Sequence, residues 1–288
     1  MTTSEMAGQH NPPSAGADTT GVPSGRARRL RRRRLQRASY VVAIGLVVLA
    51  AVSIDWATVQ DKFFNPTYIK KQFPEIVTVG AKNTILLTVF SFFGGLLIGL
   101  TMALLRRSEL RPYRWVASVY IEIFRGLPAL LTIFLVGSIL PVALQVRFPD
   151  IAGLSSAGVV ALSLVYGAYI AETIRAGLEA VPRGQTEAAR SLGMSPTRTM
   201  ASIVIPQAFR IVIPPLTNEM IALLKDTALV AVLGTTALGK ELTKFGRDGV
   251  GDEFNGTPLV VAGLLYLVIT IPLTRLVAQL EKRNAQSR

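Results

Sequence analysis

The sequence predicts an all-α protein that crosses a membrane about six times, and three observations lead to this prediction. Half of the 288 residues are hydrophobic and the mean hydropathy is +0.42, which is too apolar for a typical soluble domain. About six apolar runs alternate with polar segments, and each is near the length of about 20 residues that a spanning helix needs. Arginine is concentrated in the N-terminal segment and in alternate loops, as expected if those parts face the cytoplasm.

The missing residue types exclude several kinds of site. The chain has no Cys, and its single His, His10, lies in a polar tail, so we expect no disulfide, no metal site and no catalysis built on these residues. The net charge of +13 is clustered in the first 37 residues and scattered over loops, without the interleaved aromatic residues of a nucleic-acid surface. The sequence therefore predicts no nucleic-acid partner and no cofactor.

The N-terminal region is predicted to be a tail followed by one extra helix. Residues 1–25 are rich in Pro, Gly, Ser and Thr and should be disordered, whereas Arg26–Arg37 holds eight arginines that suit anionic lipid at the cytoplasmic face. The apolar run Ala38–Ile54 is the first predicted span, with a cleaved signal peptide as the alternative. We divide this part into a tail, residues 1–37, and a helix with an external loop, residues 38–74.

The second span carries closely spaced glycines. The segment before it, Asp55–Ala81, is polar, holds two prolines and is predicted to be an external loop with room for a short interfacial helix. Asn83–Leu105 is the span itself. Gly94, Gly95 and Gly99 give it a spacing at which another helix packs closely, either within the chain or between two copies.

The third and fourth spans contain polar residues. Trp115–Val146 is the third span, with Glu122 and Arg125 near its start, so its buried part should begin near Leu127. Ala157–Leu178 is the fourth span. Its polar residues recur at three-residue steps and share one face of a helix: Tyr166, Tyr169, Glu172 and Arg175.

The segment between the fourth and fifth spans, residues 184–206, is long, polar and helix-forming. Good helix formers occupy Gln185–Leu192, and Gly193 is placed to end that helix in a left-handed turn. Ser195 and the proline after it are typical of an N-cap and a first helical position, and Pro206 should interrupt the second helix. The prediction is a helix, a sharp turn and a second helix.

The last two spans complete the topology. Gln207–Leu238 is apolar but interrupted by Pro214-Pro215 and by the polar triplet that begins at Lys225. Gly239–Thr257 is predicted to be a polar external loop, and Pro258–Leu280 is the sixth span. With the Arg-rich loops inside, both termini and the polar segment between spans four and five face the cytoplasm.

One motif resembles a nucleotide site without its context. Gly234–Lys240 matches the first seven positions of a phosphate-binding loop, but Glu241 stands where a Ser or Thr should bind Mg²⁺. No strand-then-helix unit surrounds the run. We therefore expect no ATP hydrolysis on this chain.

Charged residues inside the spans mark a candidate path for a polar solute, because such a charge normally faces a cavity or a partner. Glu219 and Lys225 lie nearly two turns apart on the fifth span, and Thr227 follows. A zwitterion needs a cation for its carboxylate, for which Lys225 and the Thr227 hydroxyl are available, and an acceptor for its ammonium, for which Glu219 is available. Arg125 would attract an acidic side chain. Alternatively, these charges pair with neighbouring helices and only hold the bundle together.

The segment 184–206 also resembles a family motif. Glu187-Ala188-Ala189, Gly193 and Pro206, at their spacing, resemble the EAA loop of binding-protein-dependent ABC importer permeases, with Ile205 where Leu is usual. The resemblance implies that this loop is cytoplasmic and docks on an ATPase subunit. The coupling residues that it implies are Gly184, Glu187, Ala188, Ala189, Gly193 and Pro206.

Other stretches resemble the polar-amino-acid subgroup of these permeases, although Leu127 and Ala228 replace the usual Thr and Ser. These stretches are Ile121–Pro128, Tyr169–Arg175, Gly184-Gln185 and Asn218–Leu229. The resemblance implies a type I ABC importer permease fold over residues 75–288. The resemblance implies that Glu219 and Lys225 lie on the substrate-lining helix, and its stretches also contain Glu122, Tyr169 and Glu172. The predicted substrate-binding residues are these five together with Thr227 and Arg125 from the charge argument.

The function implied by the resemblance is that of a permease subunit in the bacterial inner membrane, which moves a polar amino acid such as glutamate by alternating access. Its partners would be ATP-binding cassette subunits, a second permease subunit and an extracytoplasmic solute-binding protein. An ion-coupled secondary transporter, a membrane-bound assembly protein and an ABC permease for another small polar solute remain as alternatives. The hydropathy shows no inverted repeat, which speaks against the first alternative.

Overall fold

The structure is a computed structural model, and it describes residues 25–146, 148–151, 153–234 and 237–286. The chain divides into two units, Met1–Trp56 and Ala57–Arg288. Among the described residues, five helices are long and apolar enough to cross a membrane, or six if one bent pair is counted as a span. The all-α, multi-span prediction is therefore confirmed. The predicted disordered tail lies outside the described residues, except for its last residue.

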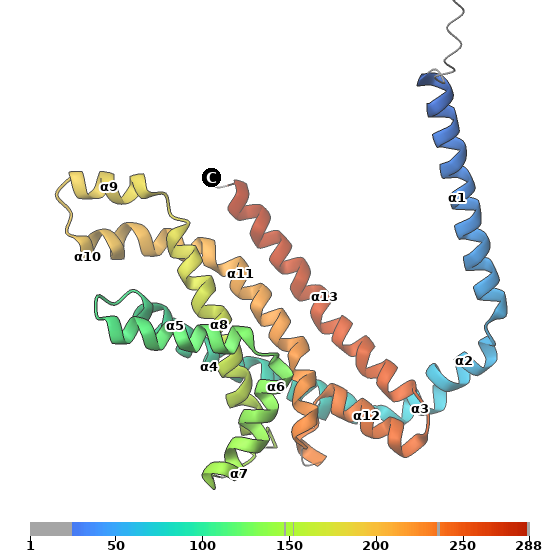
Figure 1. The fold of residues 1–288 in the computed structure, drawn as a ribbon. Helices are drawn as coiled ribbons and strands as arrows, with labels where there is room; N and C mark the ends of the chain where they lie inside the picture. The colour runs from blue at the N-terminus through green and yellow to red at the C-terminus, as the bar shows by residue number, and fades with distance from the viewer. Residues whose placement is uncertain (1–24, 147, 152, 235–236, 287–288) are drawn as a thin grey trace, which may run out of the picture. The chain divides into compact units, whose positions relative to one another are not determined.

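The first unit consists of the single helix α1, Gly25–Ser53 (Figure 1). The arginine cluster and the predicted first span lie on this one helix. Leu35–Ser53 is long and apolar enough to cross the membrane, and its side chains are not buried within the protein, as suits a helix that faces lipid. After the helix, the Trp56 indole Nε1 donates to the Ala51 carbonyl at 2.7 Å.

The second unit is built around two packed helices, α4 (Lys82–Arg106) and α8 (Ser156–Glu179). A Cβ atom at Gly99 would lie 2.9 Å from the Gly167 carbonyl oxygen and 2.7 Å from a methyl of Ile170, so only glycine permits this approach. The predicted glycine spacing therefore serves packing within the chain. The main core lies along α8, where Leu162, Val165 and their neighbours are almost fully buried.

The predicted third span is not one straight helix. Helix α5 (Arg111–Gly126) and the helical run Ala129–Leu144, which comprises α6, η2 and α7, meet at an angle of 109°. The cause is Pro128, which lacks a backbone N–H and forces the residue before it out of the helical region. Leu127 is accordingly extended, with φ −84° and ψ 143°. The predicted third span is therefore bent at Leu127, the residue near which its buried part was predicted to begin.

The polar segment between spans four and five forms the predicted helix, turn and helix. Helix α9 is Arg183–Ser191, Gly193 has φ +83°, and α10 begins at Pro196 (Figure 1). The Gly193 N–H donates to the Arg190 carbonyl and the next N–H donates to the Ala189 carbonyl, which is the hydrogen-bond pattern of a Schellman turn. The Ser195 hydroxyl caps α10 by accepting from the Arg198 N–H at 3.3 Å. These local predictions are confirmed.

The interruptions predicted at Pro206 and at Pro214-Pro215 are absent. Pro196–Leu233 is continuous through α10, the π turn η3 (Met200–Val204), α11 (Ile205–Asp226) and the 3₁₀ turn η4 (Thr227–Leu233). The π turn skips an intrahelical bond just before Pro206, which accommodates that proline without a break. Pro214 and Pro215 lie inside α11. Spanning helices tolerate proline where neighbouring elements satisfy the freed backbone groups. At the polar triplet α11 ends and the run continues as the 3₁₀ turn η4.

The predicted external loops are largely helical. Residues 55–81 form α2 (Trp56–Phe63), α3 (Pro66–Gln72) and the π turn η1 (Ile76–Ala81). The predicted loop 239–257 contains α12 (Leu242–Glu253), which packs on α13 (Thr257–Gln286).

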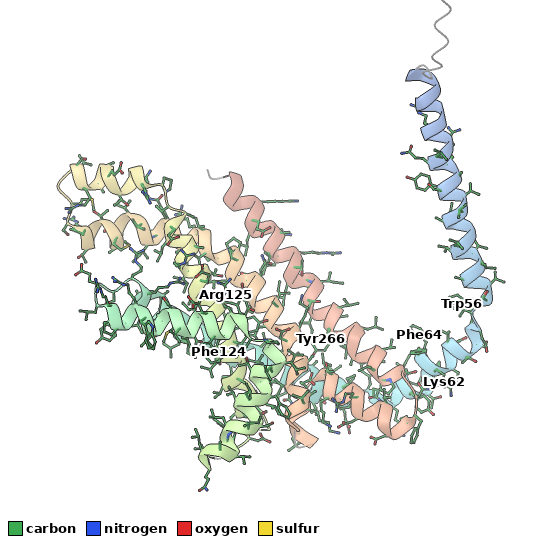
Figure 2. All side chains as sticks on the ribbon, in the orientation of Figure 1. Trp56, Lys62, Phe64, Phe124, Arg125 and Tyr266 are labelled. Carbon is green, nitrogen blue, oxygen red and sulfur yellow. The ribbon has the colours of Figure 1, made fainter. Side chains whose placement is uncertain are left out.

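These two segments are hydrogen-bonded to each other. The Asn255 side chain donates to the Asp61 carbonyl at 2.7 Å, and the Gly256 N–H donates to the Lys62 carbonyl at 2.8 Å. Figure 2 shows Lys62 beside the turn between α12 and α13. The region before α4 is thus anchored to the loop between the last two spans.

A buried carboxylate holds the start of α12. Glu241 is fully buried and accepts hydrogen bonds from the Thr243 N–H at 2.6 Å, the Lys244 N–H at 2.5 Å and the Tyr266 hydroxyl at 2.9 Å. It is the N-cap of α12 and, through Tyr266, joins that helix to α13. Burial raises the pKa of Glu241 above its ordinary value of 4.5, although these hydrogen bonds oppose the shift.

We expect acid to stabilise this junction. Because the folded-state pKa of Glu241 is raised, the folded protein takes up its proton at a higher pH than the unfolded chain does, so stability falls as pH rises through that pKa. Lowering the pH from about 7 to about 5 should therefore increase the thermal stability of the wild type relative to Glu241→Gln, which carries no charge at either pH. Melting curves of both proteins in lipid nanodiscs test this, and a stability difference that does not change with pH would contradict it.

Candidate functional site

The first candidate site is the surface of α9 and the turn after it. Ala189 is 6% exposed and packs inward, whereas Glu187, Ala188 and Gly193 face solvent. Leu192 is 85% exposed, although leucine is among the residues most often buried in proteins. Its exposure was not predicted, and it places one large apolar side chain at the end of a helix whose outer face is polar.

The remaining residues predicted for coupling lie at the edges of this surface. Gly184 is exposed in the first turn of α9, and a Cβ atom there would meet no other residue. Pro206 is exposed in the first turn of α11. The helical pair is held on the end of α8 by a small core of Val181, Val204 and Ala208. The structure thus presents α9 and its turn as a projecting unit on a packed base.

An ion-pair network ties the base of this unit to the bundle. The Glu172 carboxylate lies 2.9 Å from an Arg106 nitrogen of α4 and is hydrogen-bonded by Arg175 of its own helix. Arg175 also pairs with Glu179 at 2.5 Å, at the end of α8 that leads into α9. Glu172, which the sequence predicts for substrate binding, therefore has two arginine partners. This position suits a residue that fixes α8 against α4.

The second candidate site is a polar cluster where α5, α8 and α11 meet. The Arg125 guanidinium carbon lies 5.7 Å from the centre of the Tyr169 ring, within the range of a cation–π contact. Arg125 also interacts electrostatically with Glu219 of α11. The sequence placed these three residues in a substrate path, and the structure brings them together.

Two further residues join this cluster. The Tyr166 hydroxyl donates to the Asp226 carboxylate at 2.9 Å, and the Tyr166 and Tyr169 rings are 6.0 Å apart. Tyr166 also interacts electrostatically with Glu219. Asp226 was missed as a candidate, although its spacing pointed to it: Glu219 and Asp226 are one heptad apart and so share a face of α11.

The structure separates Lys225 from Thr227. Lys225 is exposed and forms no ion pair with a carboxylate in the part of the chain that the structure describes. Thr227 is 0% exposed, and its hydroxyl donates to the Leu224 carbonyl at 2.7 Å and lies 3.4 Å from the Tyr266 hydroxyl. Two residues two positions apart on a helix face roughly opposite directions. Glu122 is exposed on α5, away from both.

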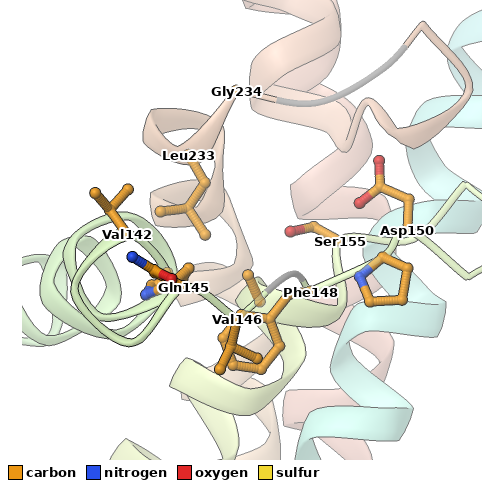
Figure 3. Close-up of a pocket in the computed structure, with 12 residues that line it drawn as sticks. Val142, Gln145, Val146, Phe148, Asp150, Ser155, Leu233 and Gly234 are labelled. Atoms are coloured by element: carbon orange, nitrogen blue, oxygen red, sulfur yellow. The ribbon is translucent and has the colours of Figure 1, made fainter.

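A cavity of about 820 Å³ lies at the end of the bundle away from α9, beside α7 (Leu140–Leu144). Val142 and Gln145 line one side, and Asp150 and Ser155 line the other, with Leu233 of η4 between them (Figure 3). None of the predicted substrate residues lines this cavity. The cavity is linked to the polar cluster by η4, which lines the cavity through Leu233 and continues α11.

Comparisons with known proteins cover most of the second unit. Residues 95–286 match the family model described as "Binding-protein-dependent transport system inner membrane component". The arginine transport system permease protein ArtQ of Bacillus subtilis is 36% identical over 204 residues, which are 71% of this chain and 90% of that protein. The glutamate/aspartate import permease protein GltK of Escherichia coli is 35% identical over 214 residues, with 72% and 92% covered.

The fold has a counterpart among solved structures. A chain of an amino acid ABC transporter, crystallised with histidines, matches with a TM-score of 0.68 and 35% identity. The match covers 75% of this chain and 96% of that one. The residues matched by the family model, 95–286, span both the α9 unit and the polar cluster at the junction of α5, α8 and α11.

Proposed function

We propose that this chain, which belongs to the family of binding-protein-dependent transport system inner membrane components, is the permease subunit of an ABC importer for a polar amino acid. The observation that carries the proposal is the exposed α9 helix with its Gly193 turn, a projecting unit with a polar outer face and an exposed Leu192 at its end. Such a unit suits docking on a soluble ATPase subunit, and the family supplies the membrane component of such systems.

Coupling would run through helices that leave this unit without a break. Helix α10 continues through η3 and α11 into η4 as one run, Pro196–Leu233, and α8 leads directly into α9. A displacement of α9 and α10 by a closing ATPase would therefore move α11, which carries Glu219 and Asp226, relative to α8. We infer that this movement opens the polar cluster alternately to the two sides of the membrane.

Glutamate is the substrate that we propose. Arg125 and Lys225 would receive its two carboxylates, and Glu219 with Asp226 would accept hydrogen bonds from its ammonium group. Tyr166 and Tyr169 would supply the wall between them. The nearly equal identity to an arginine permease and to a glutamate/aspartate permease means that overall similarity does not decide the sign of the substrate charge. The exposed cationic side chains of Arg125 and Lys225 support the proposal of an acidic substrate.

The path would be completed by a second permease subunit. Glu122, Arg125 and Lys225 are exposed in the single chain, as residues are before a partner covers them. The other partners that we propose are two ATPase subunits inside and an extracytoplasmic binding protein outside. The chain is a multi-pass inner membrane protein, and we place both of its termini in the cytoplasm. Residues 75–288 would form the transport domain, with 38–74 and 1–37 as additions to it.

Reconstituted uptake tests this proposal. The chain with its ATPase and binding protein in vesicles should accumulate labelled glutamate only when ATP is present on the cytoplasmic side. Arginine and glutamine at the same concentration are the matched competitors. A preference for arginine would contradict the proposal of an acidic substrate but would agree with the proposal of an ABC importer. Uptake driven by an ion gradient without ATP would show a secondary transporter instead.

A further inference from the structure

The C-terminal end of α12 carries an aromatic side chain in an unfavourable backbone conformation. Phe254 ends that helix with φ +49° and ψ +37°, in the left-handed region. Glycine or asparagine is usual at such a position, because the Cβ atom of a bulky residue raises the energy of this conformation. Phe254 is also 89% exposed, so the described chain provides little packing in return. Strain of this kind persists where another contact offsets it, and here that contact must come from outside the described chain.

Two more phenylalanines lie close to this turn. Phe63 ends α2, Phe64 follows it, and both side chains are about half exposed. The hydrogen bonds from Asn255 and Gly256 to carbonyl groups of α2 join the two segments, and a Cβ atom at Gly256 would lie 3.1 Å from the Phe63 ring. Phe63, Phe64 and Phe254 therefore form one exposed aromatic surface, to which α2 and the turn between α12 and α13 both contribute.

Helix α2 also lacks packing within the chain. It has eight residues, Trp56–Phe63, and none of them is buried. An isolated helix shorter than about 12–15 residues is marginal in water. Such a helix is stabilised when one of its faces lies in an apolar environment, as in interfacial helices at a membrane surface. Helix α2 thus needs the same kind of contact as Phe254.

The aromatic surface lies at the end of a membrane span. Helix α13 begins at Thr257, directly after this turn, and Thr257–Lys282 is long and apolar enough to cross the membrane. An exposed apolar stripe runs along one face of α13, as expected for a helix that faces lipid. Its members are Leu264, Leu267, Val268 and Ile271. The aromatic surface therefore stands where the hydrocarbon of the bilayer meets the headgroups.

We propose that Phe63, Phe64 and Phe254 insert into the boundary between the headgroups and the acyl chains of the bilayer, with α2 lying along it. Phenylalanine and leucine side chains occupy this boundary in interfacial helices. Asp61 and Lys62 are exposed and pair with each other at 3.2 Å, so their charges can remain among the headgroups. The partner is thus phospholipid. The proposed topology makes the leaflet the outer one, and only that choice of leaflet depends on the proposed function.

Fluorescence quenching by brominated lipid tests the contact directly. Trp56 and Trp115 are the two tryptophans of the chain, and replacing both by Phe leaves a full-length protein in which Phe254→Trp introduces a single fluorophore. In phosphatidylcholine vesicles, bromine atoms in the upper part of the acyl chains should quench this fluorophore, because interfacial side chains reach about 5–10 Å into the boundary. Leu192→Trp in the same background is the matched control, since Leu192 is 85% exposed and lies in the turn after α9.

The two quenching patterns should be opposite. Brominated lipid should quench Phe254→Trp severalfold more strongly than Leu192→Trp, whereas acrylamide in the water should quench Leu192→Trp more strongly. Quenching of Phe254→Trp by acrylamide alone would overturn the proposal. Protection of Phe254→Trp from both quenchers would also overturn it, because a second copy of the chain or another protein would then cover the surface.

The stability of a second variant separates lipid contact from simple exposure. Phe254→Asn removes the ring and introduces a residue that tolerates the left-handed conformation, so relief of strain alone would keep or raise the melting temperature. We expect a lower melting temperature in phosphatidylcholine nanodiscs, because the lost burial of the ring in lipid outweighs the relieved strain. Gln145→Asn, at the end of α7 where φ is +54°, is the matched control and should not lower it. A melting temperature of Phe254→Asn at or above that of the wild type would contradict the proposal.

Discussion

Lys225→Met should reduce glutamate uptake at least tenfold while the complex still assembles. Lys225 is exposed on α11 and forms no ion pair with a carboxylate in the described chain. Its removal therefore leaves no buried charge unpaired. A charge-assisted hydrogen bond to the substrate is worth about 1.5–3 kcal/mol, and about 1.4 kcal/mol corresponds to a factor of ten. The methionine side chain keeps most of the length of lysine and removes the ammonium group. The loss should therefore appear in transport and not in stability.

The measurement is uptake together with ATPase activity in the same vesicles. Lys82→Met, which removes an exposed lysine at the start of α4, is the matched control and should transport normally. Normal uptake by Lys225→Met would remove this lysine from the substrate path. Loss of assembly would show that the charge holds the bundle together, which is the alternative that the sequence left open. Uptake by Asp226→Asn is a second test, because Asp226 is a residue of the polar cluster that only the structure identified.

Gly193→Val should abolish uptake and weaken association with the ATPase, while membrane insertion stays intact. Gly193 adopts φ +83°, which costs an L-residue about 1–2 kcal/mol and is least tolerated by a β-branched side chain. A Cβ atom at this position would meet no other group, so the expected effect comes from the backbone and not from a clash. The valine should open the Schellman turn and change the angle between α9 and α10, which alters the docking surface.

Asparagine provides the matched control at this position. Among residues with a side chain, Asn tolerates the left-handed conformation best, so Gly193→Asn should retain most of the uptake. Co-purification with the ATPase and uptake of labelled glutamate are measured for both variants. Full uptake by Gly193→Val would remove the turn from the coupling mechanism, and equal loss in both variants would point to the added side chain rather than the backbone conformation of the turn.

The local features of this chain were readable from its sequence because short-range rules govern them. The spans follow from runs of apolar residues, and their number agrees with the helices found. The turn at Gly193 follows from a glycine after a helix-forming run and a Ser-Pro pair at the start of the next. The loop 239–257 was misjudged, since α12 is short and its start depends on the buried Glu241 cap.

Proline shows where local rules reach their limit. Pro128 bends the third span by 109°, whereas Pro206, Pro214 and Pro215 leave the fifth span continuous. The chemical defect is the same each time, a missing N–H and a bulky ring. Whether it breaks the helix depends on neighbouring turns and helices that satisfy or fail to satisfy the freed carbonyl groups. No pattern within the sequence distinguishes the two cases.

The membership of the polar cluster was likewise decided by tertiary packing. The sequence alone determined that charged residues would lie within the spans, since their cost in a bilayer implies a cavity or a partner. It did not determine that Glu172 pairs with Arg106, that Tyr166 meets Asp226, or that Thr227 turns away from Lys225. Those outcomes depend on which faces of α4, α8, α11 and α13 pack together. Helix packing joins residues far apart in the chain, and the periodicity of one helix does not specify its neighbour.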